Sequence, residues 1–168
     1  RCFDTIAALS AQIADMTPSP WRSITTAGGS YFSGITTHTT TGSSNTSNSE
    51  VGVRFQKYSP TDAITIYRVF LKGTVRRTDS NAMSDDTNLL TLPLFYRPMK
   101  PVNCVTNSDA SSSVYHGSSC HIKISANGVV EFQRRLISGD PDGTDPATSY
   151  IVLDDVSWWT DNDSSATW

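Results

Sequence analysis

The chain has 168 residues and carries 13 lysines and arginines against 16 aspartates and glutamates, for a net charge of −3. No basic cluster is larger than the pairs Arg76–Arg77 and Arg134–Arg135, so the sequence lacks the basic surface that a nucleic-acid backbone requires. No apolar run approaches the roughly eighteen residues of a membrane span. Hydrophobic residues make up 37% and charged residues 17%, and the rich remainder of Ser, Thr, Asn and Gly favours a single β-rich domain with large polar loops.

The first sixteen residues carry a heptad-like seam. Its apolar residues are spaced 4, 3, 4 and 3 apart, namely Cys2, Ile6, Leu9, Ile13 and Met16. This pattern predicts a helix over residues 1–16, and so short a helix is marginal in water unless a partner covers its seam. We expect it to be a stalk that associates with copies of itself in an oligomer, and isoleucine at a with leucine at d favours two strands by packing alone. The alternative is one amphipathic helix docked on its own domain.

Two prolines follow in residues 17–20, which are expected to end the helix and form a linker. The β head then spans residues 21–168 and begins at Trp21, which is expected to be a core or interface anchor beneath the stalk. Residues 27–49 contain glycines and then a run with almost no apolar residue, which predicts a long surface loop. Alternating residues predict a strand over 51–55, with a turn at 58–62.

The longest ordered-looking stretch covers residues 64–98. Tyr67, Val69, Leu71 and Val75 share one parity, which is typical of a strand with one buried face. Ile64 and Ile66 have the opposite parity, so either two strands abut there or a bulge switches the faces. A second strand is expected at 89–92, and the prolines at both ends of 93–98 predict a fixed turn or extended corner.

Further strands are expected at 102–105, around Cys120 to Ile124, and over 150–159 as one continuous closing strand. Between 120–124 and 130–132 lies Asn127–Gly128, a pair that predicts a β-hairpin with a type I′ turn. Cys104 and Cys120 fit small buried side chains on neighbouring strands, and a disulfide between them stays open at this stage.

Nothing in the sequence has the spacing of a catalytic or metal site. No G-x-S-x-G elbow is present, the aspartates of 78–88 lack the order of an EF-hand, and the glutamates are only Glu50 and Glu131. Cys120 and His121 are adjacent and would point to opposite faces of a strand. We therefore expect no enzyme activity, no catalytic residue, no metal and no cofactor.

Several of these segments together resemble one family. The segment Val69–Val75, the motif Leu92–Pro98, the Asn-Gly hairpin and the last strand are similar to the C-terminal head domain of bacteriophage tail-fibre and baseplate receptor-binding proteins. The resemblance covers roughly residues 50–160. The family motif usually reads Leu-Pro-x-Gly-Tyr-Arg-Pro, and here Phe95 stands where glycine is usual.

The resemblance implies a homotrimer whose head is all-β, an antiparallel β-sandwich or Greek-key barrel of about eight strands. It also implies a protein made in the host cytoplasm and located in the virion, at the phage tail tip, beside other tail or baseplate proteins. Its function would be non-covalent binding of a bacterial cell-wall or capsular glycan. The alternatives are a structural fibre or baseplate module without a ligand, a surface-polysaccharide depolymerase, and a non-viral lectin.

Sugar binding needs aromatic rings that stack on sugar faces and polar groups that bind hydroxyls. The candidate residues in loops and at the last strand are Tyr115, His116, Asp142, Asp145, Trp158 and Trp159. For the loop residues the alternative is plain solvation. For the two tryptophans it is burial in the core, because one parity of their strand must face inward.

Overall fold

A computed structural model describes residues 17–37, 50–61, 64–79, 83–110, 118–136, 148–154 and 156–160. The regular secondary structure of the described residues consists of strands and one short 3-10 helix, which confirms the all-β prediction. The predicted stalk helix and its residues Ile6, Leu9, Ile13 and Met16 lie outside the described residues. Within the described part of the chain, no helix has the length and apolar character needed to cross a membrane.

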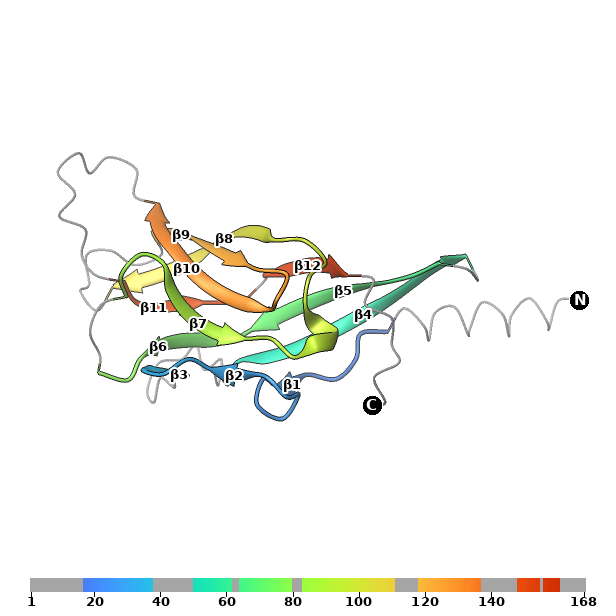
Figure 1. Ribbon diagram of the computed structural model, residues 1–168, viewed down its shortest axis with the longest axis horizontal. Helices are drawn as coiled ribbons and strands as arrows, with labels where there is room; N and C mark the ends of the chain where they lie inside the picture. Colours follow the sequence, from blue (N-terminus) through green and yellow to red (C-terminus); the bar gives the residue numbers. More distant parts are fainter. Residues whose placement is uncertain are drawn as a thin grey trace, which may run out of the picture.

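The strands belong to two antiparallel sheets (Figure 1). The four-stranded sheet has the order β1-β4-β5-β12, and the eight-stranded sheet has the order β2-β7-β10-β9-β8-β11-β6-β3. The bounds are β1 Arg22–Ser23, β2 Ser30–Tyr31, β3 Ile35–Thr37, β4 Gly52–Thr61, β5 Ile64–Lys72, β6 Thr74–Arg77, β7 Thr87–Thr91, the 3-10 helix η1 Leu94–Tyr96, β8 Val102–Ala110, β9 Ser118–Ile124, β10 Val129–Leu136, β11 Thr148–Val152 and β12 Ser157–Thr160. The described strands thus number twelve where we expected about eight. The short strands β2 and β3 lie in the predicted loop of 27–49 and pair with β7 and β6, and the closing strand is divided in two.

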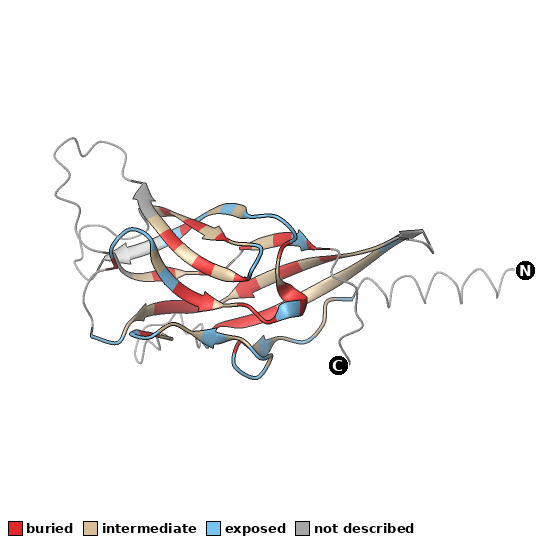
Figure 2. Cartoon of the chain, in the orientation of Figure 1, coloured by how far each residue is buried: buried red, intermediate tan, exposed pale blue. Residues whose placement is uncertain are grey.

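One hydrophobic core lies between the two sheets. The predicted parity of the central stretch is confirmed, since Tyr67, Val69, Leu71 and Val75 are all buried. From the larger sheet come the buried side chains of Leu89, Leu90, Cys120, Ile122, Ile124, Val130, Phe132 and Ile151. Figure 2 shows buried positions alternating with partly exposed ones along these strands, as a sheet with one covered face requires.

The chain crosses from one sheet to the other at Gly73, between β5 and β6. Beside it, β11 leads into β12 in the opposite direction. Gly73 N–H donates to Asp154 Oδ1 at 2.7 Å, and its carbonyl accepts from Leu153 N at 2.7 Å. The prediction of one closing strand over 150–159 is therefore wrong: Asp154 marks the point where that segment also changes sheets.

The motif Leu92–Pro98 forms η1 and fixes the end of the core. Trp158 Nε1 donates to the Tyr96 carbonyl at 2.9 Å, and Thr160 Oγ1 donates to the Arg97 carbonyl at 2.9 Å. Phe95 is only 7% exposed, and its ring lies 5.1 Å from that of Tyr67 in an edge-to-face arrangement. Its backbone has no positive φ, so this turn does not need the glycine of the resembled motif.

The Asn127–Gly128 hairpin is confirmed between β9 and β10, but its turn type differs from the prediction. A type I′ turn needs positive φ at both central residues, and here Gly128 has φ +89° whereas Asn127 does not have a positive value. Gly128 N donates to the Ser125 carbonyl, and Ser125 N donates to the Val129 carbonyl. The loop is thus three residues long and ends on glycine, with the Arg97 side chain packed where a β-carbon would stand.

Strand β4 runs through the turn that the sequence predicted at 58–62. It pairs with β5 as far as Thr61 opposite Ile64, with a register shift between Tyr58 and Thr61. β5 is one strand from Ile64 to Lys72, so two strands do not abut here. The extra residue lies on β4, and Ile66 keeps the outward parity of Arg68 without a change of face on β5. Figure 1 shows this hairpin extending beyond the rest of the two sheets.

Cys104 on β8 and Cys120 on β9 lie on neighbouring strands and are not joined by a disulfide. They are not opposite each other, because Cys104 pairs with Ile122 and Cys120 with Thr106. Cys120 is fully buried, and partial burial raises the pKa of the Cys104 thiol.

Replacing Gly73 with alanine should destabilise the fold more than the same change at Gly28. Both have positive φ, +101° and +92°, which costs a non-glycine residue about 1–2 kcal/mol. An added β-carbon at Gly73 would also lie 2.9 Å from the Glu50 carbonyl oxygen, whereas at Gly28 it would meet nothing within 4 Å. We expect urea denaturation to show an additional loss of about 1–3 kcal/mol for Gly73→Ala. Equal losses would contradict the close packing at the crossing.

Alkylation by iodoacetamide should distinguish the two described cysteines. Because its pKa is raised, a smaller fraction of the Cys104 thiol is thiolate at pH 8 than in an unfolded cysteine. The alkylation rate of Cys104 in the folded protein should therefore increase at a higher pH than its alkylation rate in the unfolded chain. Cys120 should react only on unfolding. Peptide mass spectrometry measures both rates, with the denatured chain as the control. A bridged Cys104–Cys120 peptide would contradict the structure.

Candidate functional site

The structure separates the two tryptophans that the sequence proposed for ligand binding. Trp158 is 3% exposed and belongs to the core, where its indole N–H is bound to the Tyr96 carbonyl. Its ring is therefore not offered at the surface, which matches the alternative given for it. Trp159 is 51% exposed on the outer face of the four-stranded sheet. The other candidates, Tyr115, His116, Asp142 and Asp145, lie outside the described residues.

Trp21, the predicted interface anchor, is partly exposed at the start of the described chain. The Arg54 guanidinium lies 4.5 Å from its ring centroid, and Lys72 Nζ lies 5.0 Å from it. The ring thus lies over the four-stranded sheet, among cations of β4 and β5. Its role in a trimer stays a prediction.

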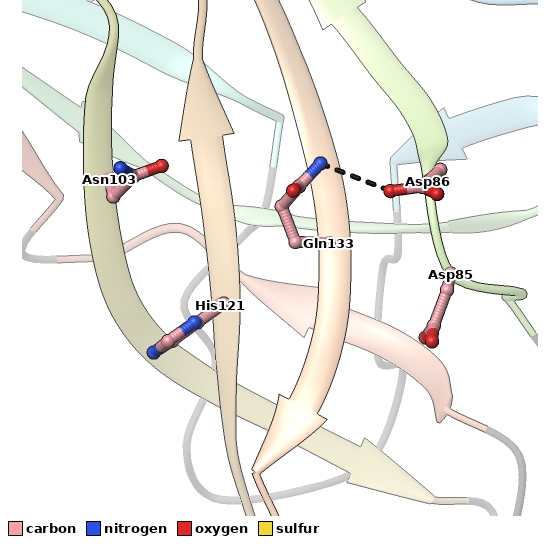
Figure 3. A pocket seen from close by; sticks show the side chains of 5 residues that line it. All are labelled: Asp85, Asp86, Asn103, His121 and Gln133. Atoms are coloured by element: carbon pink, nitrogen blue, oxygen red, sulfur yellow. Dashed lines mark hydrogen bonds between the residues drawn. The ribbon is translucent and has the colours of Figure 1, made fainter.

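A polar hollow of about 460 Å³ opens on the eight-stranded sheet (Figure 3). Asn103 comes from β8, His121 from β9 and Gln133 from β10, and these three strands are neighbours in the sheet. Asp85 and Asp86 complete the lining from the turn before β7, the next strand along. The inward-facing neighbours Ile122 and Phe132 and others of their parity are buried, so the lining groups stand on a sheet held rigidly by the core.

Hydrogen bonds order one side of this hollow. Gln133 Nε2 donates to Glu131 Oε1 at 2.6 Å and lies 3.3 Å from Asp86 Oδ1. Lys123 Nζ in turn lies 3.8 Å from Glu131 Oε2. The register explains why Gln133 reaches the turn: a shift between Phe132 and Arg134 leaves it as the extra residue of β10.

Asp86 has a φ of +60°, the only positive value among the described non-glycine residues. Aspartate tolerates this left-handed conformation better than most residues. The turn around it is held by Thr87 Oγ1, which donates to the Ser84 carbonyl at 2.6 Å. The conformation directs the Asp86 carboxylate toward Gln133, as Figure 3 shows.

The lining groups are suited to hydrogen bonding. Amide side chains donate and accept, an imidazole does both, and carboxylates accept. In the part of the chain that the structure describes, no three His, Cys, Asp or Glu side chains are grouped as a metal site would require. The hollow therefore has the chemistry to bind a ligand rich in hydroxyl or amide groups.

Sequence signals for this site are weaker than those for the loops. Asn103, His121 and Gln133 are polar residues between buried neighbours, which places each on an outer sheet face. Their juxtaposition depends on the order β7-β10-β9-β8, which single-strand periodicity does not contain. No protein-family model matches the chain, and no curated protein matches it significantly.

Replacing Asp86 with alanine should destabilise the protein, whereas Asp85→Ala should leave stability nearly unchanged. Alanine at position 86 would bear a left-handed penalty of about 1 kcal/mol and would lose the bond to Gln133. Asp85 is exposed and provides the matched control one residue away. Thermal denaturation compares the two variants, and equal midpoints would show that the left-handed turn is not under constraint.

Proposed function

We propose that the protein is the head of a bacteriophage tail-fibre or baseplate receptor-binding protein and binds a bacterial surface saccharide without altering it. The observation that carries the proposal is the hollow lined by amide, imidazole and carboxylate groups on a rigid sheet. The motif Leu92–Pro98, on which the family resemblance depends, supports it as an ordered part of the head, held to β12 by hydrogen bonds from Trp158 and Thr160.

A saccharide suits this hollow because sugar hydroxyls both donate and accept hydrogen bonds. Asp85 and Asp86 can accept from them, and Asn103 and His121 can do either. The groups lie on the outer face of a sheet and not in a deep cleft, so a long glycan could lie across them. The proposal includes no cleavage step.

In this proposal the two sheets form a β-sandwich head, and the helix predicted over 1–16 joins three chains through Ile6, Leu9, Ile13 and Met16. Trp21 would lie beneath that stalk. Once one hollow of the trimer has bound the bacterial surface, the other two hollows meet further saccharides at a high effective concentration. Each hollow can therefore bind its saccharide weakly. The head would act at the phage tail tip, next to other tail or baseplate proteins.

Asn103→Ala and His121→Ala should each weaken binding to host bacteria by about tenfold, with little change in stability. Loss of one hydrogen bond to a ligand group accounts for a change of this size. Asn107→Ala is the matched control, because Asn107 is an exposed asparagine on the same strand that does not line the hollow. Binding of the fluorescently labelled protein to a panel of bacteria and to a glycan array measures the effect.

Three outcomes of that experiment have different meanings. Binding that Asn103→Ala and Asn107→Ala weaken equally would contradict the hollow as the site. A protein that labels no bacterium and no glycan would favour the structural fibre module. Shortened polysaccharide chains after incubation would favour a depolymerase.

A further inference from the structure

The outer face of the four-stranded sheet carries a row of alternating cations and aromatic rings. We call it the cation–aromatic row, and its members are Lys72, Trp21, Arg54, Phe70, Arg68, Trp159 and Tyr58. The strand register produces it, since Arg54 lies opposite Phe70 and Arg68 lies opposite Trp159. The row therefore crosses β4, β5 and β12 on one face.

The contacts within the row are close. Arg54 Cζ lies 4.5 Å from the Trp21 ring centroid and 5.3 Å from that of Phe70. Arg68 Cζ lies 5.1 Å from Phe70 and 5.8 Å from Trp159. These distances fall within the range of cation–π attraction, so the rings hold the guanidinium groups in place.

No described acidic residue forms an ion pair with the cations of the row. The outward positions of β4, β5 and β12 include no aspartate or glutamate. Within the residues that the structure describes, neither Arg54 nor Lys72 forms an ion pair, and Arg68 donates only to Ser157 Oγ, at 3.1 Å. Three uncompensated cations thus lie together on a chain whose net charge is −3.

The contacts with the rings also affect which ligand groups these cations can bind. A guanidinium held by its face on an aromatic ring keeps N–H donors in its plane, where they can bind a carboxylate or phosphate. Arg54 Nε is enclosed and has no hydrogen-bond partner, so this group is held by the rings. Trp159, half exposed at the end of the row, offers an apolar surface against which a sugar ring can stack.

We infer that the cation–aromatic row is a second glycan-binding surface, which takes acidic saccharides bearing carboxylate or phosphate groups. Arg54 and Arg68 would bind the anionic groups, and Trp159 would stack on a neighbouring sugar ring. This inference rests on the proposed function for its ligand class, but not on the hollow for its site. The two surfaces lie on the outer faces of different sheets, so each can be removed separately.

Tryptophan fluorescence of the intact chain can test this inference, because Trp159 is half exposed in the row. Oligogalacturonate supplies carboxylates and phosphomannan supplies phosphates. Fully methyl-esterified oligogalacturonate and neutral mannan are the matched uncharged probes. We expect one or both acidic probes to bind, the neutral forms to bind at least about tenfold more weakly, and about 0.5 M sodium chloride to weaken the acidic complexes.

The variant Arg54→Gln/Arg68→Gln should lower affinity for the acidic probe by about tenfold or more. Lys100→Gln removes an exposed cation outside the row and should have no effect. Arg68→Lys keeps the charge without the planar donors and should be intermediate. If the double variant fails to fold, the effects of salt and of esterification on the unaltered chain still test whether acidic saccharides bind through their charge.

Equal binding of the esterified probe, insensitivity to both salt and the double variant, or a preference for oligo(dT) over every acidic glycan would overturn the inference. The proposed function fails in a different experiment: Asn103→Ala would then leave binding to bacteria unchanged. Loss of binding in Arg54→Gln/Arg68→Gln together with retained binding in Asn103→Ala would keep the row and remove the hollow.

Discussion

The crossing at Gly73 is the constraint on which the rest of this fold depends. There the paired segments β5–β6 and β11–β12 leave one sheet and enter the other, so the two sheets are continuous through a single ribbon. Only a residue without a side chain fits, because the Glu50 and Val51 backbone lies against it. The hydrogen bond from Gly73 N–H to Asp154 replaces the ladder bond that the bend interrupts.

This continuity separates the two surfaces that carry the functional arguments. Because the inner faces share one core, the hollow and the cation–aromatic row project from outer faces of different sheets. Their chemistry differs accordingly. The hollow offers hydrogen-bonding groups without a Phe, Tyr or Trp ring, and the row offers such rings and cations without a carboxylate. In a glycan with both neutral and acidic sugars, the hollow would suit the neutral sugars and the row would suit the acidic ones.

Much of the fold could be predicted from local pattern, and the site could not. The parity of Tyr67, Val69 and Leu71 defined a buried face, and Asn127–Gly128 located a hairpin. The turn type was missed because the Arg97 side chain, which packs against Gly128, comes from a segment far away in the sequence. The closing strand was read as continuous because its apolar residues are buried in both sheets, and only Asp154 signals the break. The hollow and the row needed strand order and register, which come from contacts between residues far apart in sequence.

The margins of the larger sheet have a consequence for how these molecules can be packed. Its outermost strands, β2 and β3, have two and three residues, so little unpaired backbone is presented at either side. A long free margin would invite neighbouring molecules to add strand upon strand and form fibrils. Copies crowded into one particle would therefore not join through this larger sheet into a continuous one.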